Sequence, residues 1–244
     1  MQHEELRQLY ADLLVEVFQR ARQHRDVLRV LDLGAGEGSV TLPMLELGAH
    51  VTAVDISADQ LEVLKVKYAR FGDRLEIRCG DIAELMSEGD VAYDVITANS
   101  FLYHIPDYLG MLEGLLPRLS RHGQFFSFQD PLFYGSQSRF ERGYDKMAYG
   151  IWRLGRGDVW AGLQRRLRRA RGVYLPDSIH DNSEFHALRD GVNQAAIAAL
   201  FQRAGYADRI VCYFSTQARV FQSLGAALGL KNTFAFIASP HAAD

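Results

Sequence analysis

Apolar and polar residues follow two different periods along the first 130 residues of the chain. The opening 20 residues place apolar side chains at helical spacing and so predict an amphipathic helix. Short apolar runs of strand length follow, separated by stretches with helical spacing. This alternation predicts a parallel sheet with helices on both faces. The expected strands are 27–33, 50–55, 75–79, 94–98 and 124–128, and the expected helices are 39–47, 57–68 (capped by Ser57) and 108–119.

This rhythm stops after Asp130. Residues 131–189 are polar and rich in glycine and arginine, with helical rather than alternating character. A helix over 194–204 then leads to strands over 210–214 and 233–238. No crossover helix is evident between these last two strands, which favours an antiparallel pair at the sheet edge. We therefore expect a single domain, residues 1–244, that carries a helical cap insertion at 131–189.

Composition sets broad limits on the function. The chain has 244 residues and 48% hydrophobic content, enough for a substantial core. A net charge of -3 gives no general attraction to nucleic acid or to an anionic membrane. Cys79 and Cys212 are far apart, so neither a disulfide framework nor a zinc site is indicated. The first residues, MQHEELRQLY, are polar and charged, unlike the apolar core of a secretion signal, and no apolar run approaches the roughly 20 residues that span a bilayer. A cytoplasmic protein is expected.

The stretch VLDLGAGEGS, residues 30–39, places three glycines between a strand and a helix. Glycines there let the backbone approach a ligand and present amides at a helix N-terminus. The dinucleotide fingerprint G-x-G-x-x-G needs a glycine where this chain has Ser39. Asp32, two residues before the first glycine, would repel a pyrophosphate but can accept hydrogen bonds from a cationic amino-acid tail, directly or through water. The match to a dinucleotide site is therefore weak.

Acidic residues end the next two strands as well. Asp55 is placed to bind both ribose hydroxyls, and Ile56 suits one face of an adenine. Asp81 follows the third strand, where it can accept a hydrogen bond from an exocyclic amine. Each acid alone is equally well explained as a helix cap or a turn residue. Together with Asp32 they fall at the carboxyl ends of consecutive parallel strands, which is where open α/β sheets bind ligands.

With these residues in view, the chain resembles the class I S-adenosylmethionine-dependent methyltransferases that act on small molecules. The matching text is VLDLGAGEGSVTLPMLELGAHVTAVDISADQL, CGDI, YDVITANSFLYHIPD and LLPRLSRHGQFFSFQD, in family order over roughly residues 27–130. The resemblance implies a Rossmann-like seven-stranded, mostly parallel sheet whose final strand is antiparallel. It also implies S-adenosyl-L-methionine as the cofactor.

The resemblance further assigns parts of the cofactor to residues of this chain. Asp32 and the glycine turn would surround the methionine part, and Asp55 would bind the ribose. Ile56 and Ile82 would enclose the adenine, and Asp81 would hold its amine. Asn99 would lie near the methionine end. The full set of expected cofactor contacts is Asp32, Gly34, Ala35, Gly36, Asp55, Ile56, Asp81, Ile82, Asn99 and Ser100.

A sulfonium methyl group already has a good leaving group, so such an enzyme mainly aligns the acceptor, excludes water and in some cases removes a proton. His104 follows the fourth strand and titrates near neutral pH, which makes it the candidate base. The equal alternative is that His104 only packs against or caps the next helix. Oxygen and nitrogen are the favoured acceptor atoms, with carbon left open.

The insertion and its borders contain the remaining candidates. His180 and His186 flank a polar segment, but their spacing is not that of a helical metal pair, and no metal is expected. Aromatic residues of the insertion either wall an acceptor pocket or form the core of the cap: Tyr144, Tyr149, Trp152 and Trp160. The expected substrate contacts are Tyr103, Asp130, Phe133, Tyr134, His180 and His186.

The basic run from Arg165 to Arg171 either contacts nucleic-acid phosphates or forms a solvated helix face, and the second is favoured. The expected function is therefore methyl transfer to a small molecule, with the cap, the N-terminal helix and Tyr10 closing over the site. A homodimer is left open. One rival is a NAD-type oxidoreductase, disfavoured by Ser39 and Asp32. Another is an S-adenosylmethionine-binding protein of the same fold that transfers no methyl group.

Overall fold

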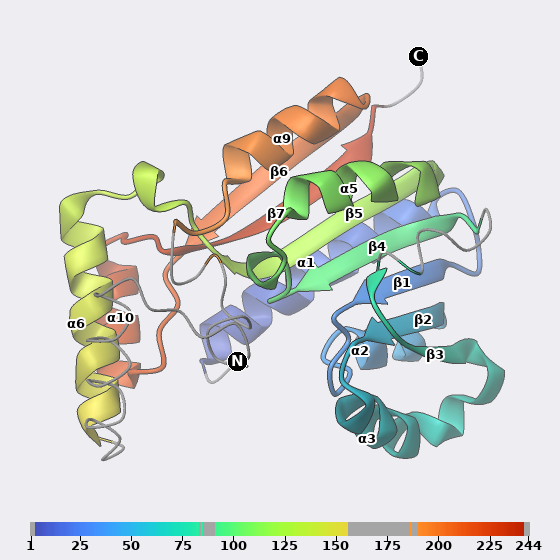
Figure 1. Ribbon diagram of the computed structural model, residues 1–244, viewed down its shortest axis with the longest axis horizontal. Helices are drawn as coiled ribbons and strands as arrows, with labels where there is room; N and C mark the ends of the chain where they lie inside the picture. Colours follow the sequence, from blue (N-terminus) through green and yellow to red (C-terminus); the bar gives the residue numbers. More distant parts are fainter. Residues whose placement is uncertain (1–2, 83, 85–90, 156–185, 187–189, 242–244) are drawn as a thin grey trace.

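A computed structural model describes residues 3–82, 84, 91–155, 186 and 190–241. Its centre is a seven-stranded sheet in the order β3-β2-β1-β4-β5-β7-β6 (Figure 1). All neighbouring strands from β3 to β5 are parallel, whereas β7 runs antiparallel to both β5 and β6. The strands are β1 Arg29–Leu33, β2 His50–Asp55, β3 Leu75–Cys79, β4 Tyr93–Asn99, β5 Leu119–Pro131, β6 Tyr206–Tyr213 and β7 Thr233–Pro240.

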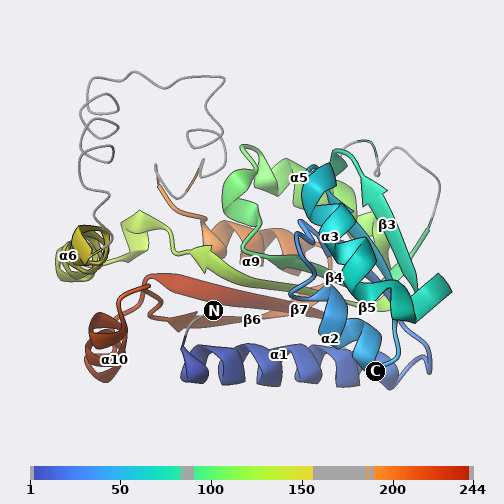
Figure 2. The ribbon, with the colours of Figure 1, turned by 90° about the horizontal axis from the view of Figure 1, so that it is seen from below.

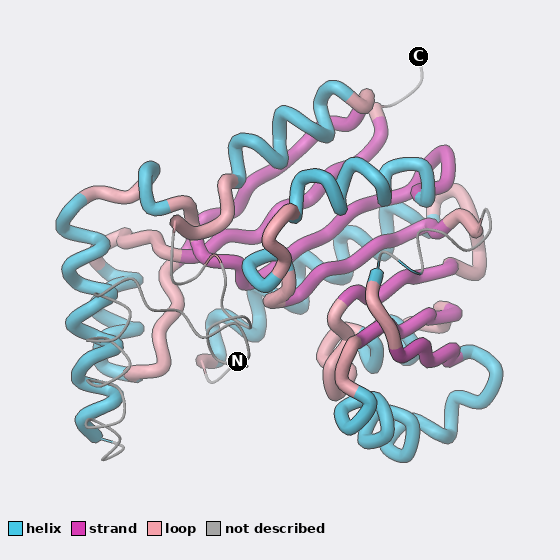
Figure 3. The backbone as a smooth tube through the Cα atoms, in the orientation of Figure 1, coloured by secondary structure: helices cyan, strands magenta, loops and turns pink. Residues whose placement is uncertain are grey.

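The predicted parallel sheet with an antiparallel final strand is confirmed. Helices cover both faces, as Figures 2 and 3 show. One face packs against α1 Glu4–Arg22, α2 Thr41–Glu46 and α3 Ala58–Tyr68, and the other against α5 Tyr108–Leu115 and α9 Gln194–Arg203. Successive side chains of a strand point to opposite faces, so Phe126 and Phe128 join the first core and Phe125 the second.

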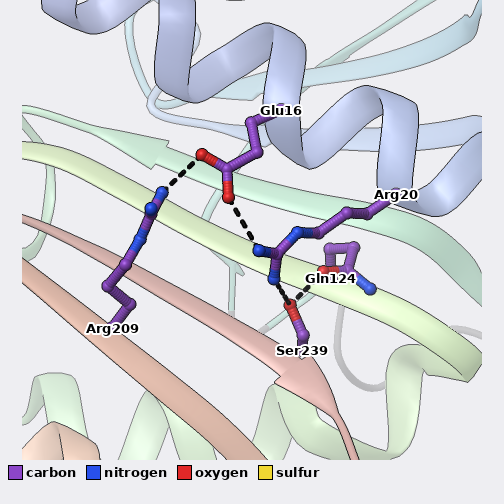
Figure 4. Close-up of polar contacts among 5 residues, drawn as sticks. All are labelled: Glu16, Arg20, Gln124, Arg209 and Ser239. Carbon is purple, nitrogen blue, oxygen red and sulfur yellow. Dashed lines mark hydrogen bonds and ion pairs between the residues drawn. The ribbon is translucent and has the colours of Figure 1, made fainter. Parts of the chain in front are cut away.

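Helix α1 confirms the amphipathic pattern at the start of the chain, because the apolar positions of that pattern are buried. Its polar edge is linked to the sheet by exposed contacts, shown in Figure 4. Glu16 bridges Arg20 at 2.8 Å and Arg209 of β6 at 2.6 Å. Arg20 also reaches Ser239 of β7, which bonds to Gln124 of β5. Solvent screens such pairs, so the buried apolar face supplies most of the attachment.

Several element boundaries differ from the sequence prediction, most clearly around α5 and β5. The helix expected over 108–119 ends at Leu115, and a single 3-10 turn containing Pro117 leads into β5. Strand β5 is longer than expected because it begins at Leu119, with a register shift against β4 between Tyr93 and Val95. A second register shift interrupts the pairing of β5 with β7 between Phe128 and Asp130. Gln129 lies at this bulge with φ of 67°, a left-handed conformation that non-glycine residues seldom adopt.

The described part of the insertion contains a 3-10 turn, Tyr134–Ser136, and helix α6, Arg139–Gly155. Helix α6 lies beside α10, Arg219–Ala227, at one end of the molecule (Figure 1). The ring of Tyr144 is buried against Phe214 and Phe221, so Tyr144 belongs to a small core of this layer. Tyr149 and Trp152 contact each other, with ring centroids 5.9 Å apart. Trp160 lies outside the described residues.

Helix α10 is absent from the sequence prediction. Its N-cap residue, Ala218, makes no side-chain hydrogen bond, so the helix has no capping signal.

The two cysteines are both free. None of the helices in the described ranges is long and apolar enough to cross a membrane. The role of residues 131–189 as a cap stays a prediction.

Candidate active site

The glycine turn after β1 depends on backbone conformations that favour glycine. Gly34, Gly36 and Gly38 have φ of 65°, 53° and 90°. A Cβ atom on Gly34 would lie 2.3 Å from the ring of Phe101, and one on Gly36 would lie 2.8 Å from the side-chain oxygen of Gln60. The left-handed conformation favours glycine at both positions, and the ring of Phe101 leaves no room for a side chain on Gly34.

Asp55, at the end of β2, joins this turn to the following helix. Its Oδ2 accepts a hydrogen bond from the amide of Gly36 at 2.8 Å, and its Oδ1 accepts one from the amide of Ser57 at 2.8 Å. Ser57 in turn caps α3 through the amide of Gln60, as predicted. Ala35, itself buried, donates its amide to Val54 at 3.0 Å, so the turn is also held by the main chain of β2.

Ile56, next to Asp55, exposes 81% of its surface. Asp81, which follows β3, is also exposed, whereas Ile82 is buried in the core beneath α5. The structure therefore brings an exposed aliphatic side chain to the glycine turn but directs Ile82 inward. The expected enclosure of an adenine between Ile56 and Ile82 stays a prediction, with only Ile56 on an open surface.

Asp32 lies beneath the glycine turn and is buried. Its Oδ2 accepts a hydrogen bond from the Thr41 hydroxyl at 2.6 Å, and its Oδ1 accepts one from the Thr97 hydroxyl at 3.0 Å. Burial raises the pKa of Asp32 to about 6, and the two threonine hydroxyls oppose that rise. Because both carboxyl oxygens already have partners, the described contacts give Asp32 a supporting place behind the turn.

Asn99 ends β4 on the other side of the turn. Its Nδ2 donates to the hydroxyl of Ser39 at 3.1 Å, while its Oδ1 is buried without a hydrogen-bond partner among the described residues. Buried polar atoms are normally paired, so this oxygen has an unused capacity to accept a hydrogen bond. Ser100 follows with φ of 52° and donates its amide to Phe128 of β5 at 2.7 Å.

The next turn, Leu102–His104, carries Tyr103 and His104. Their rings lie 3.9 Å apart, and the imidazole is half-buried. Burial lowers the pKa of His104, against the opposing effects of the Ser100 backbone and the Asp55 charge. A lowered pKa keeps the imidazole neutral at pH 7, which is the form that can accept a proton.

Asp130 lies behind this turn and is fully buried. Its Oδ1 accepts a hydrogen bond from the amide of Tyr103 at 3.2 Å, and its Oδ2 has no partner among the described residues. Burial raises the pKa of Asp130 to about 8, although nearby backbone amides favour the charged form. Asp130 is therefore placed to support the turn, and its expected contact with substrate stays a prediction.

The main chain after β5 pairs with the segment that leads into α9. Tyr134 donates its amide to Asp190 at 2.7 Å, and the amide of Phe133 reaches the side chain of Gln194 at 3.4 Å. His186 belongs to the same region, and its Nε2 lies 3.0 Å from the carbonyl oxygens of both Ile105 and Pro106. His180 and the basic run 165–171 lie outside the described residues. The described residues contain no group of three or more His, Cys, Asp or Glu side chains suited to a metal ion.

Known proteins resemble this chain in both sequence and fold. Residues 30–123 match a family model described as a methyltransferase domain. A ubiquinone biosynthesis O-methyltransferase of Xanthomonas euvesicatoria is 30% identical over 98 residues, which cover 40% of this chain and 41% of the relative. The matched part thus spans about two fifths of that protein.

Solved structures support the same fold over nearly the whole chain. An S-adenosylmethionine-dependent methyltransferase from Archaeoglobus fulgidus has a TM-score of 0.58 at 15% identity, over 96% of this chain and 94% of that one. The magnesium protoporphyrin IX methyltransferase from Synechocystis PCC 6803, solved with bound S-adenosylmethionine, has a TM-score of 0.54 at 16% identity. That match covers 96% of this chain and 78% of the other. At such low identity these structures show the fold alone.

Sequence reasoning missed two residues that support the glycine turn after β1. Thr97 lies directly opposite Asp32 in the register of β1 and β4, and Thr41 begins α2 nine residues after Asp32. The available signal was a pair of hydroxyl residues in otherwise apolar elements. Burying a carboxyl group requires such partners, and Asp32 in an apolar strand was itself a reason to search for them.

Replacing Gly34 with alanine tests whether the turn needs its left-handed conformation. We expect a loss of roughly 1–3 kcal/mol in the free energy of unfolding, because of backbone strain and the clash with Phe101. Chemical denaturation measures this. Gly143→Ala is the matched control, since Gly143 lies in α6 with open space around it and alanine there should stabilise the helix by roughly 0.5–1 kcal/mol. Equal effects at the two positions would contradict the account of the turn.

Replacing Asp130 with asparagine tests its burial as a titratable group. The unfolded chain releases this proton near the ordinary value of 3.8, whereas the folded chain keeps it up to about pH 8. Wild-type stability should therefore fall as the pH rises between about 4 and 8, and the variant should lack this contribution. The stability of Asp130→Asn relative to wild type should increase across that window and stay level above it. Parallel stability curves for the two proteins would exclude this role, and Asp12→Asn, on the exposed side of α1, controls for the lost charge.

Proposed function

We propose that this protein is an S-adenosylmethionine-dependent methyltransferase that acts on the oxygen or nitrogen atom of a small molecule, with carbon left open. The observation that carries the proposal is the Asp55 carboxylate, bonded to the amide of Gly36 within the methyltransferase domain. An acid and a glycine backbone that a ligand can approach closely therefore lie together at the carboxyl ends of β1 and β2, where open sheets of this kind bind ligands. Relatives of the matched region act as methyltransferases according to their names, which supports the proposal.

The residues present suit the chemical groups of S-adenosylmethionine. A carboxylate has about four acceptor positions, so Asp55 can bind ribose hydroxyls while keeping its two amide bonds. The exposed Ile56 would cover one face of the adenine, and Asp81 would accept from its amine. The unpaired Asn99 Oδ1 would accept from the amino group of the methionine part. When bound, this cofactor supplies a methyl group on a sulfonium, with a neutral thioether as the leaving group.

His104 is proposed as the group that accepts the proton of the methyl acceptor. Its ring stands half-buried in the turn after β4, beside Tyr103, and its lowered pKa leaves a nitrogen able to take a proton at pH 7. Tyr103 and the aromatic side chains after β5, Phe133 and Tyr134, would contact the acceptor. The name of the Xanthomonas relative specifies O-methylation, which favours oxygen as the acceptor atom here.

The rival functions lack support of this kind. For a dinucleotide enzyme, the position of the third glycine would have to be open, but Ser39 fills it and its hydroxyl accepts a hydrogen bond from Asn99. A protein that binds the cofactor without methyl transfer differs only in its product, so assay of an acceptor panel separates the two. We also place the enzyme in the cytoplasm, in keeping with its two free cysteines, and leave homodimer formation as a prediction.

Calorimetric titration with S-adenosylmethionine tests the role of Asp55. Asp55→Ala should weaken binding by roughly 1–3 kcal/mol, because hydrogen bonds to a buried ligand are lost. Asp55→Asn keeps one acceptor oxygen and should lose less, and Asp59→Ala on the exposed side of α3 should bind as the wild type does. NAD should not bind. Unchanged affinity in Asp55→Ala would mean that the ribose assignment is wrong, and no binding by the wild type would overturn the proposed function.

Transfer of radiolabelled methyl groups to a panel of small phenols and amines tests His104. His104→Ala should lower kcat by roughly 10²–10⁴-fold, with cofactor affinity unchanged, because the acceptor keeps its proton. His104→Gln should behave similarly, since an amide preserves much of the shape but is not a base. A rate near that of the wild type across the pH range would instead support the packing role of His104.

A further inference from the structure

The turn that carries His104 is bonded both within itself and to distant segments. Within it, the amide of His104 donates to Phe101 at 3.0 Å and the amide of Ile105 donates to Leu102 at 3.1 Å. These bonds leave the amide of Tyr103 and the carbonyl oxygens of Tyr103, Ile105 and Pro106 to be paired from outside. Partly buried backbone groups of this kind need partners, so the elements that provide them decide where the turn lies.

Asp130 accepts hydrogen bonds from the donor groups of the turn. The bulge at Gln129 ends regular pairing of β5 with β7 just before Asp130. The carboxyl group then accepts from the amide of Tyr103 at 3.2 Å, and the neighbouring amides of Phe101 and Leu102 also favour its charged form. Since Asp130 is fully buried, water cannot replace it as the acceptor for these amides.

His186 donates hydrogen bonds to the acceptor groups of the same turn. Its backbone amide donates to the carbonyl of Tyr103 at 2.8 Å, and its Nε2 lies 3.0 Å from the carbonyl oxygens of Ile105 and Pro106. Both of the latter groups are acceptors only, so Nε2 must carry a hydrogen. The imidazole also packs nearly perpendicular to the ring of Tyr108, with centroids 4.9 Å apart.

We infer that Asp130 and His186 are positioning residues that hold the Tyr103–His104 turn from opposite sides. Asp130 accepts hydrogen bonds from amides of the turn, and the His186 imidazole donates to carbonyl oxygens of the turn. The inference rests on the proposed function only for the chemical role of His104. It links two residues from opposite ends of the insertion to one short turn. Neither residue needs to touch the acceptor or the cofactor to affect the reaction.

NMR spectroscopy of histidine-labelled protein, without cofactor or acceptor, tests the inference directly. In Asp130→Ala and in His186→Leu, the released turn should become more solvated, and the pKa of His104 should rise toward its ordinary value. Hydrogen exchange at the Tyr103 amide should quicken by roughly 2- to 10-fold in Asp130→Ala, as expected for the loss of one hydrogen bond. The His104→Gln spectrum assigns the resonance.

Conservative variants separate positioning from general damage to the fold. Asp130→Asn keeps an acceptor oxygen for Tyr103, and His186→Gln keeps an N–H donor for the two carbonyls, so both should retain the wild-type titration of His104. Asp145→Ala removes a carboxylate of α6 that accepts a hydrogen bond from Asn232, and it should also leave the titration of His104 unchanged. If Asp130→Ala does not fold, His186→Leu decides, because that side chain is only half-buried.

Turnover adds an independent reading. Asp130→Ala and His186→Leu should lower kcat by roughly 10- to 100-fold with little change in KM for S-adenosylmethionine, because misplacing a catalytic group affects the chemical step. An unchanged His104 titration in both variants overturns the inference. If the variants alter the titration of His104 but the wild-type protein transfers no methyl group, the proposed function is refuted and the positioning role stands.

Discussion

The hydrogen bond from the amide of Gly36 to the Asp55 carboxylate is the contact on which the candidate site depends. It joins the turn after β1 to the end of β2, and the second oxygen of the same carboxylate holds the first residues before α3. Together with the bond from the Ala35 amide to Val54, it fixes the left-handed glycine turn against the neighbouring strand. The bond thus converts a flexible sequence into a rigid edge.

Two buried acids support this edge, one bonded to side-chain hydroxyls and the other to the backbone. Asp32 is held by the hydroxyls of Thr41 and Thr97, and Asp130 by the backbone of the next turn. Burial raises the pKa of both, so each destabilises the fold as it loses its proton. Keeping these two buried acids lowers the stability of the fold. Their role at the site explains why they are present, since each organises a turn that regular secondary structure could not hold.

Much of the fold followed from the sequence because it is local. The apolar period of α1, the runs that form β2 and β3, and the Ser57 cap depend on neighbours within a few residues. The antiparallel placement of β7 was also confirmed. The bulge at Gln129 and helix α10 were missed, because one arises from pairing between distant strands and the other lacks a cap signal.

The site shows the same division. The left-handed glycines and the place of Asp55 agree with the motif, whereas the inward direction of Ile82 and the contacts of His186 depend on packing between distant segments. The expected contact of His186 with the substrate stays a prediction, and its ring nitrogen pairs with backbone carbonyls 80 residues or more away in sequence. No periodicity or spacing specifies a contact of that range.

The central claim is that the Gly34–Gly36 turn and Asp55 form the binding site of an adenosine-containing methyl donor. A crystal structure of the full chain with S-adenosylhomocysteine tests it most directly. The account predicts density for the ligand along the glycine turn, with both ribose hydroxyls within hydrogen-bond distance of the Asp55 carboxylate. A ligand bound elsewhere, or bound there with its ribose facing away from Asp55, would contradict the account.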